Sequence, residues 1–261
     1  MQYFDCIIGA GPIVATAIHC GSYVRPTLEA LMAVSGEERL REEDPFTDEL
    51  AAVAATRLVG RRSRFEFDLN RTRDKAVYRR PEDAWGIHVW RMAPDDATVA
   101  ETLQGYDLFY ATARAVLAQL IAHHGAIVVL DIHTYNHRRD GPAAPPANSE
   151  ENPEVNLGTG SLDRARWGHI VDGFMAALLH CPSSGRSLDV RENVRFRGGH
   201  FSCWVHENFP ENACALAIEF KKTFMDEWTG LLDRRQLDGI QQALAGACQG
   251  LPDLLDQCQQ R

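Results

Sequence analysis

Short apolar runs, many with β-branched residues, recur along the chain and are separated by longer amphipathic stretches. Four runs have the length and composition of buried strands: CIIG (6–9), PIVATAIH (12–19), AIVVLDIH (126–133) and ALAIEF (215–220). In SRFEFDL (63–69) apolar and polar residues alternate, which predicts a half-buried strand, and WGIHVW (85–90) is a further candidate.

Helical spacing of apolar residues predicts helices between these strands. They are PTLEALMA (26–33), DELAAVAATRL (48–58) after Thr47, the long stretch from Asp95 to His123 before Gly125, ARWGHIVDGFMAALL (165–179) and RRQLDGIQQALAGACQGL (234–251). Strands that alternate with long helices indicate an α/β fold with a mixed, largely parallel sheet. We find no internal repeat and no boundary, so we expect a single domain over 1–261. Arg138 to Glu154 is rich in Pro, Ala and Asn, which predicts an exposed loop or a lid.

Composition narrows the class of protein. The 261 residues are 45% hydrophobic and 24% charged, and the net charge of -9 disfavours a nucleic-acid binder. No apolar run approaches the length of about 20 residues that spans a bilayer, and the first residues lack the pattern of a signal peptide. The seven cysteines occur singly, which is typical of reduced thiols, so we expect a cytoplasmic protein.

The segment DCIIGAGPIVATAIHCG (5–21) allows two interpretations. Gly9 and Gly11 match the first two glycines of a dinucleotide-binding loop, but Val14 stands where the third is required. The alternative is a turn between two strands, with His19 where the second strand ends. Polar groups at strand ends form the binding sites of open α/β sheets, so the second interpretation makes His19 a candidate ligand.

The run that ends in Asp131-Ile132-His133 repeats this arrangement. Two imidazoles and one carboxylate are a common set of zinc ligands, and Asp131 could orient the site from behind. The acidic segment REEDPFTDEL (41–50) would provide the carboxylate, from either Asp44 or Glu43. The plainer alternatives are packed histidines and a solvated acidic turn before a helix.

Two further clusters carry chemistry. Alternation in SRFEFDLNR (63–71) puts Arg64 and Asp68 on one face, where Arg64 and Arg71 could bind a carboxylate or polarise a carbonyl while Asp68 holds an arginine. An edge strand with a surface ion pair is the alternative. Glu219 lies in an apolar run, where a carboxylate is costly unless it is paired or functional. Beside a metal it would serve as a general base.

These pieces, in this order, resemble the N-formylglutamate amidohydrolase family and, more distantly, the aspartoacylase and zinc carboxypeptidase superfamily. The resemblance extends from Ile18 to Glu227, most of the chain. The matching segments are IHCGSYVRP, EEDPFTDEL, SRFEFDLNR, LDIHTYNH, NLGTG, RGG and LAIEFKKTFMDE.

The resemblance implies a zinc-dependent hydrolase of N-formyl or N-acyl amino acids, such as N-formyl-L-glutamate, on a three-layer α/β/α fold. It implies one Zn²⁺ per chain held by His19, Asp44 and His133. By the same analogy Arg64 stabilises the oxyanion, Asn70 and Arg71 bind the substrate's carboxylate, and Glu219 moves the proton. The expected partner is a small carboxylate-bearing molecule, with no nucleic acid and no membrane.

Some residues depart from the family's pattern. The carboxypeptidase-like families carry H-x-x-E at the first ligand, whereas Ser22 is the fourth residue here, which keeps Glu43 open beside Asp44. Cys20 and Thr134 replace the serines expected after the histidines. Lys221 or Lys222 could bind a second carboxylate, or both could be solvated.

Three alternative functions stay open: a zinc carboxypeptidase, another deacylase and a non-catalytic binding relative. Iron, manganese and cobalt are the alternative metals.

Overall fold

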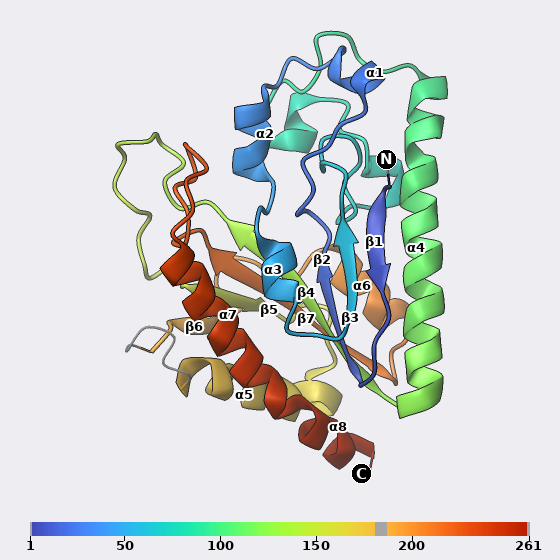
Figure 1. The fold of residues 1–261 in the computed structure, drawn as a ribbon, viewed down its shortest axis with the longest axis vertical. Coiled ribbons are helices and arrows are strands. Elements are labelled where there is room, and N and C mark those ends of the chain that lie inside the picture. The colour runs from blue at the N-terminus through green and yellow to red at the C-terminus, as the bar shows by residue number, and fades with distance from the viewer. Residues whose placement is uncertain (1, 181–186, 260–261) are drawn as a thin grey trace.

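A seven-stranded mixed sheet forms the centre of the protein in the computed structural model, which describes residues 2–180 and 187–259 (Figure 1). The strands are β1 (Phe4–Ile7), β2 (Ile13–Ala17), β3 (Thr56–Gly60), β4 (Ile127–Tyr135), β5 (Val155–Gly158), β6 (Val190–Glu192) and β7 (Ala213–Lys221). Their order is β1-β3-β2-β4-β7-β5-β6. The β1–β3 and β5–β7 pairs are antiparallel and the other pairs are parallel, which confirms the predicted fold class.

Helices cover both faces of the sheet and make the fold three-layered (Figure 1). The helices are α1 (Pro26–Glu29), α2 (Gly36–Glu42), α3 (Thr47–Ala51), α4 (Asp96–His124), α5 (Arg164–His180), α6 (His200–Asn208), α7 (Arg234–Gln249) and α8 (Leu251–Gln259), with 3₁₀ turns at Arg73–Lys75 and Pro81–Ala84. α4 and α6 pack on one face, and α3, α5, α7 and α8 pack on the other. The long helix α4 begins and ends where its pattern predicts, at the Asp95 cap and at Gly125.

The two cores meet at the central strands because successive residues of a strand point to opposite faces. In β4, Val129 packs in the core beneath α4, and Val128 and Leu130 pack in the core beneath α5 and α7. All nine residues of β4 are buried, as expected of a central strand that is covered on both sides. The ends of such a strand are therefore the places where its polar residues reach a cavity.

Two local predictions are wrong. SRFEFDL is a turn, in which the carbonyl of Ser63 accepts from the backbone N–H of Glu66 at 2.9 Å. The strand lies earlier, at β3, which overlaps the end of the stretch predicted as the helix 48–58, and α3 ends at Ala51. Pairing of β3 with both β1 and β2 overrides the helical preference of this alanine-rich segment.

Other boundaries differ from the predictions as well. Residues 85–90 form no strand beyond an isolated bridge between Met32 and Trp90, and the helix predicted over 26–33 is the single turn α1. The pattern missed β5, β6, α2, α6 and α8, which are short elements of at most nine residues. The turn at Gly9–Pro12 between β1 and β2 is confirmed, and this excludes the dinucleotide loop.

The segment from Arg138 to Glu154 is the predicted irregular, largely exposed loop, and its role as a lid stays a prediction. Five cysteines are free: Cys6, Cys20, Cys203, Cys214 and Cys248. Cys181 and the side chain of Cys258 lie outside the described residues. No helix in the described part of the chain combines the length and apolar character needed to cross a bilayer.

Glycines allow the ends of β2 and β3 to approach closely on either side of His19. A Cβ on Gly21 would lie 2.2 Å from the carbonyl carbon of Arg61, and one on Gly60 would lie 2.4 Å from the carbonyl oxygen of Ile18. No side chain fits between these backbones, so the approach fixes the course of the segment that carries His19.

We therefore expect Gly21→Ala to destabilise the protein by about 1–3 kcal/mol, the usual cost of overpacking. Gly250→Ala is the matched control, because a Cβ there meets no atom within 4 Å. Denaturant unfolding of both variants measures the difference. Equal stability of the two variants would contradict the proposed constraint.

Candidate metal centre and active-site pocket

Three polar side chains converge where β2 and β4 end. His19 follows β2 by two residues, and His133 lies near the end of β4. Asp44 joins them from the segment between α2 and α3, because its backbone N–H donates to the carbonyl of His19 at 3.0 Å. The hydroxyl of Thr134 donates to Oδ1 of Asp44 at 2.8 Å and fixes the orientation of the carboxylate.

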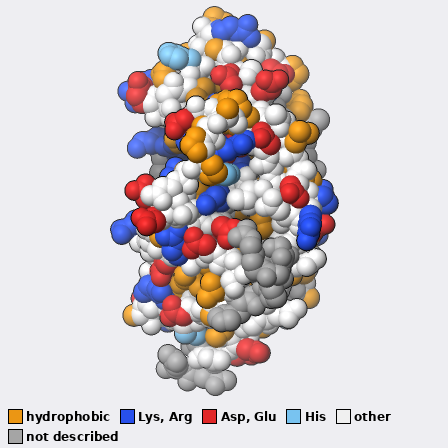
Figure 2. All heavy atoms as spheres, turned by 90° about the vertical axis from the view of Figure 1, so that its left-hand side faces the viewer, with side chains coloured by type: hydrophobic (Ala, Val, Ile, Leu, Met, Phe, Trp, Pro, Cys, Tyr) orange, Lys and Arg blue, Asp and Glu red, His pale blue; other side chains and the backbone are white. Residues whose placement is uncertain are grey.

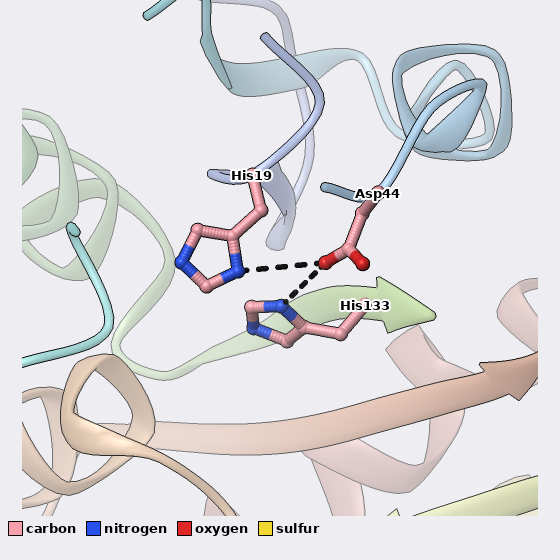
Figure 3. A group of neighbouring side chains, drawn as sticks. All are labelled: His19, Asp44 and His133. Atoms are coloured by element: carbon pink, nitrogen blue, oxygen red, sulfur yellow. Dashed lines mark hydrogen bonds and ion pairs between the residues drawn. The ribbon is translucent and has the colours of Figure 1, made fainter. Parts of the chain in front are cut away.

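The carboxylate of Asp44 faces both imidazoles (Figure 3). Its Oδ2 lies 3.4 Å from Nδ1 of His19 and 3.2 Å from Nδ1 of His133, and all three side chains are at most 4% exposed. Burial alone would raise the pKa of Asp44, but the contacts with the two histidines outweigh it and lower the pKa well below its usual range. Asp44 is therefore an anion at neutral pH.

A second carboxyl group lies behind each histidine. Nε2 of His19 is 2.7 Å from Oδ1 of Asp68, and Nε2 of His133 is 3.1 Å from Oδ1 of Asp131. Since an ionised carboxylate only accepts, each Nε2 carries the proton and each Nδ1 is left to face Asp44. The predicted position of Asp131 behind His133 is confirmed. Asp68 also binds Arg64, as predicted, but its contact with His19 was not foreseen.

This arrangement fits a metal ion. Two ligand atoms about 2.0–2.1 Å from a tetrahedral zinc lie about 3.3 Å apart, close to the separations between Asp44 and the two Nδ1 atoms. Nδ1 of His19 is buried and makes no hydrogen bond with any described residue. The His–Asp contacts behind the ring nitrogens are those that usually orient metal-binding histidines. His19, Asp44 and His133 are the group of potential ligands that meets in the described residues.

Glu43, the alternative third ligand, points elsewhere. Its carboxyl group accepts a hydrogen bond from the hydroxyl of Ser63, and burial raises its pKa to about 7. The structure therefore favours Asp44 as the acid that faces the histidines.

A pocket of about 340 Å³ opens over the three side chains. Arg64 lines it, with Nη2 2.8 Å from Oδ2 of Asp68, Nε 3.1 Å from the hydroxyl of Tyr78, and the guanidinium 4.7 Å from the ring centre of Trp85. Asp68 thus binds both Arg64 and His19 through its two oxygens. This fixes the guanidinium relative to the histidines.

Asn70 and Arg71 line the same pocket, in the turn that follows Asp68. Oδ1 of Asn70 accepts from the backbone N–H of Phe201 at 2.9 Å, which leaves its amide NH₂ on the side of His133, 3.5 Å from Nε2. Arg71 donates to the carbonyl of Asp83 at 3.3 Å, and its Nε lies 4.0 Å from Oδ2 of Asp68. The side chain is 37% exposed, so part of its guanidinium remains accessible to a ligand.

Glu219 also lines the pocket, beside His133, because the two residues are register partners on β7 and β4. Burial raises the pKa of Glu219 to about 8, against the opposing effect of His133. A nearby cation would lower this pKa toward neutrality, the range in which a general base is most effective. The predicted site residues are therefore all brought together in one pocket.

Sequence reasoning missed several residues in the pocket or beside it. Tyr78 contacts both Arg64 and Asp68. Lys222, which the sequence suggested for a second carboxylate, lines the pocket and directly follows β7. Arg195 and Arg197 also line the pocket. The matching RGG segment could have drawn attention to these residues, but no periodicity places it near His19.

Comparisons with known proteins agree with this description. A family model described as N-formylglutamate amidohydrolase matches residues 11–225. The structure of an N-formylglutamate amidohydrolase from Ralstonia eutropha JMP134 is similar, with a TM-score of 0.74 and 16% identity over 98% of this chain and 99% of that one. A gene product from Agrobacterium tumefaciens has a TM-score of 0.64 and 18% identity over 100% of this chain and 96% of that one.

A metallo-carboxypeptidase from Burkholderia cenocepacia is also matched, with a TM-score of 0.36 and 16% identity over 94% of this chain and 56% of that one. A search of curated proteins finds no match.

The fold and the family model together define a hydrolase of the amidohydrolase class. More closely, because the model covers most of its length, the chain belongs to the N-formylglutamate amidohydrolase family, which confirms the resemblance seen in the sequence.

The choice between Asp44 and Glu43 gives a direct test of the metal centre. We expect Asp44→Asn to weaken zinc binding by more than the roughly 10- to 100-fold that loss of an outer hydrogen bond costs, because the carboxylate that faces both Nδ1 atoms loses its charge. Glu43→Gln, a matched buried control, should retain the metal. Metal content and zinc titration of both variants, beside His19→Ala and His133→Ala, measure this. Retention in Asp44→Asn with loss in Glu43→Gln would reverse the assignment.

Proposed function

We propose that the chain is a metal-dependent amidohydrolase that cleaves the amide of an N-formyl or N-acyl amino acid, such as N-formyl-L-glutamate, to the acid and the free amino acid. The observation that carries the proposal is the convergence of His19, Asp44 and His133 next to Glu219 in one pocket. We further propose one zinc per chain, a single domain over 1–261 and a cytoplasmic location.

The bound metal would supply Lewis acidity and lower the pKa of water toward 7. His19, Asp44 and His133 would hold it. Glu219 would accept a proton from the attacking water and deliver it to the departing amine, which restores its carboxylate. Its position beside His133 suits this role, since the base must lie next to the metal ligands.

Arg64 would stabilise the negative charge that develops on the carbonyl oxygen. Its guanidinium is anchored by Asp68 and Tyr78, so it needs little reorganisation as the charge forms. Asn70 and Arg71 would bind the α-carboxylate of the substrate through the amide NH₂ and a second guanidinium. These donors distinguish an N-acyl amino acid from a simple amide.

A substrate panel tests the reaction class. Formate or acyl release from N-formyl, N-acetyl and longer N-acyl amino acids, measured with the zinc-loaded protein, should show turnover that chelation abolishes and zinc restores. Cleavage of C-terminal residues from peptides instead would favour a carboxypeptidase. Binding without turnover of any compound would favour the non-catalytic relative.

We expect Glu219→Gln to lower kcat by about 10²–10⁴-fold, the usual contribution of a general base, while the zinc content stays at the wild-type level. Glutamine preserves the size of the side chain but cannot accept the proton. Steady-state kinetics and metal analysis of the same preparation separate the two effects. Wild-type turnover in this variant would remove Glu219 from the mechanism.

A further inference from the structure

A buried lysine lies beside the candidate metal ligands and has no part in the proposed reaction. On the face in Figure 2 basic side chains reach the surface and lie among acidic ones, whereas Lys222 is 1% exposed. Lys222 directly follows β7, and its backbone N–H donates to the carbonyl of Tyr135 at 3.0 Å. It is therefore tied to the end of β4, the strand that carries His133. A buried ammonium group is costly unless it is bound, so its partners are informative.

The ammonium group of Lys222 donates to two backbone carbonyls, that of Arg41 at 2.6 Å and that of Glu43 at 2.7 Å. An ammonium group has three N–H donors, so these contacts occupy most of its capacity. They make Lys222 a poor candidate for the second carboxylate that the sequence suggested. Lys221, the other lysine suggested for that role, does not line the pocket.

Both carbonyls belong to the segment that leads into Asp44. α2 ends at Glu42, and the last carbonyls of a helix have no partner within the helix. Lys222 binds the carbonyls on either side of Glu42, and Nη1 of Arg64 donates to the carbonyl of Glu42 itself at 3.1 Å. Cations at a helix C-terminus satisfy such carbonyls. The backbone immediately before Asp44 is thus held by two basic side chains of the pocket lining.

The peptide bond between Glu43 and Asp44 is held at both of its polar ends. Its carbonyl accepts from Lys222 at 2.7 Å, and its N–H donates to the carbonyl of His19 at 3.0 Å. Since a peptide unit is planar, the two contacts together set its orientation and the direction in which the Asp44 side chain leaves the backbone. One contact comes from the residues after β2 and the other from the end of β7. Lys222 therefore relates Asp44 to the strands beside His133.

The charge of Lys222 adds to these hydrogen bonds. Burial lowers the pKa of Lys222, and the nearby carboxylates of Asp44, Glu42 and Glu227 oppose this effect. The lysine thus interacts with Asp44 both through the backbone and through its charge.

We infer that Lys222 is a positioning residue of the candidate metal centre: it holds the Glu43–Asp44 peptide so that the Asp44 carboxylate faces both imidazoles. The inference deepens the proposed function and rests on it, because the metal is the one that this function requires. Lys222 acts through Asp44 and needs no contact with the substrate. This assigns to the fold a role for the lysine that the sequence suggested for ligand binding.

Zinc affinity, measured by competition with a chromophoric chelator, tests the inference. Lys222→Met keeps nearly the length of the side chain but removes its donors and its charge. We expect it to weaken zinc binding by about 10- to 100-fold, the usual effect of losing a contact that orients a metal ligand. Lys221→Met is the matched control, because it changes the neighbouring buried lysine outside the pocket and should bind zinc as the wild type does.

A double-mutant cycle separates positioning from a general loss of stability. If Lys222 acts through Asp44, Lys222→Met should cause no further loss of zinc affinity in the Asp44→Asn background. A loss of the same size in both backgrounds, or wild-type affinity of Lys222→Met, would overturn the inference. Circular dichroism checks the folding of each variant. If Lys222→Met does not fold, Lys222→Gln, which retains a donor, takes its place in the cycle.

If the wild type binds no zinc, the proposed metal-dependent function fails, and amide hydrogen exchange in the metal-free protein then tests the positioning alone. The same measurement decides if Asp44→Asn binds zinc too weakly for the cycle. We expect the backbone N–H of Asp44 to exchange faster in the Lys222 variant than in Lys221→Met, because its segment is released. The N–H of Val129, in the middle of β4, should exchange alike in both. Equal exchange at Asp44, or the same acceleration at Asp44 and Val129, would overturn the inference.

Discussion

The site depends on one carboxylate that faces two buried imidazoles. Asp44 can lie between His19 and His133 only because the segment that carries it is bonded to the backbone of His19 and because Thr134 fixes its other oxygen. Asp68 and Asp131 then determine which nitrogen of each ring faces inward. Each imidazole thus has a carboxylate next to both of its ring nitrogens. Together these contacts orient both Nδ1 atoms toward Asp44.

Burial explains why the cluster is tied so closely to its surroundings. Several carboxyl groups are buried beside the two histidines, and an isolated buried charge is costly. Arg64 compensates one of them through Asp68. A divalent cation between Asp44 and the Nδ1 atoms would compensate more of this negative charge. Burial lowers the pKa of His133, but the contacts with Asp131 and Asp44 outweigh it and raise the pKa, so without a metal they favour a protonated ring. A bound cation would take the place of that proton. Metal binding and the stability of this region are therefore expected to be coupled.

Asp68 connects two parts of the pocket. One oxygen meets His19 and the other meets Arg64 and the hydroxyl of Tyr78, so the candidate metal ligand and the candidate oxyanion donor share one buried carboxylate. Asn156 has a similar role for the backbone of Arg195 and Phe196, which line the pocket elsewhere. The carboxylate of Asp68 and the amide of Asn156 both act by fixing the positions of other residues. Sequence patterns do not reveal such contacts between distant parts of the chain.

The sequence by itself determined the central strands, the long helix α4 and the chemistry of the strand ends, because apolar runs and a capped amphipathic stretch depend on local composition. It also indicated His19, His133 and Glu219, which lie within such runs or at their ends. Only the tertiary structure decided that 63–69 is a turn and that β3 begins directly after an alanine-rich segment, where a helix was predicted, since pairing with two neighbours overrides local preference. It alone separated Asp44 from Glu43 and brought Arg195 to the pocket, because contacts between residues far apart in the chain have no periodicity to predict them.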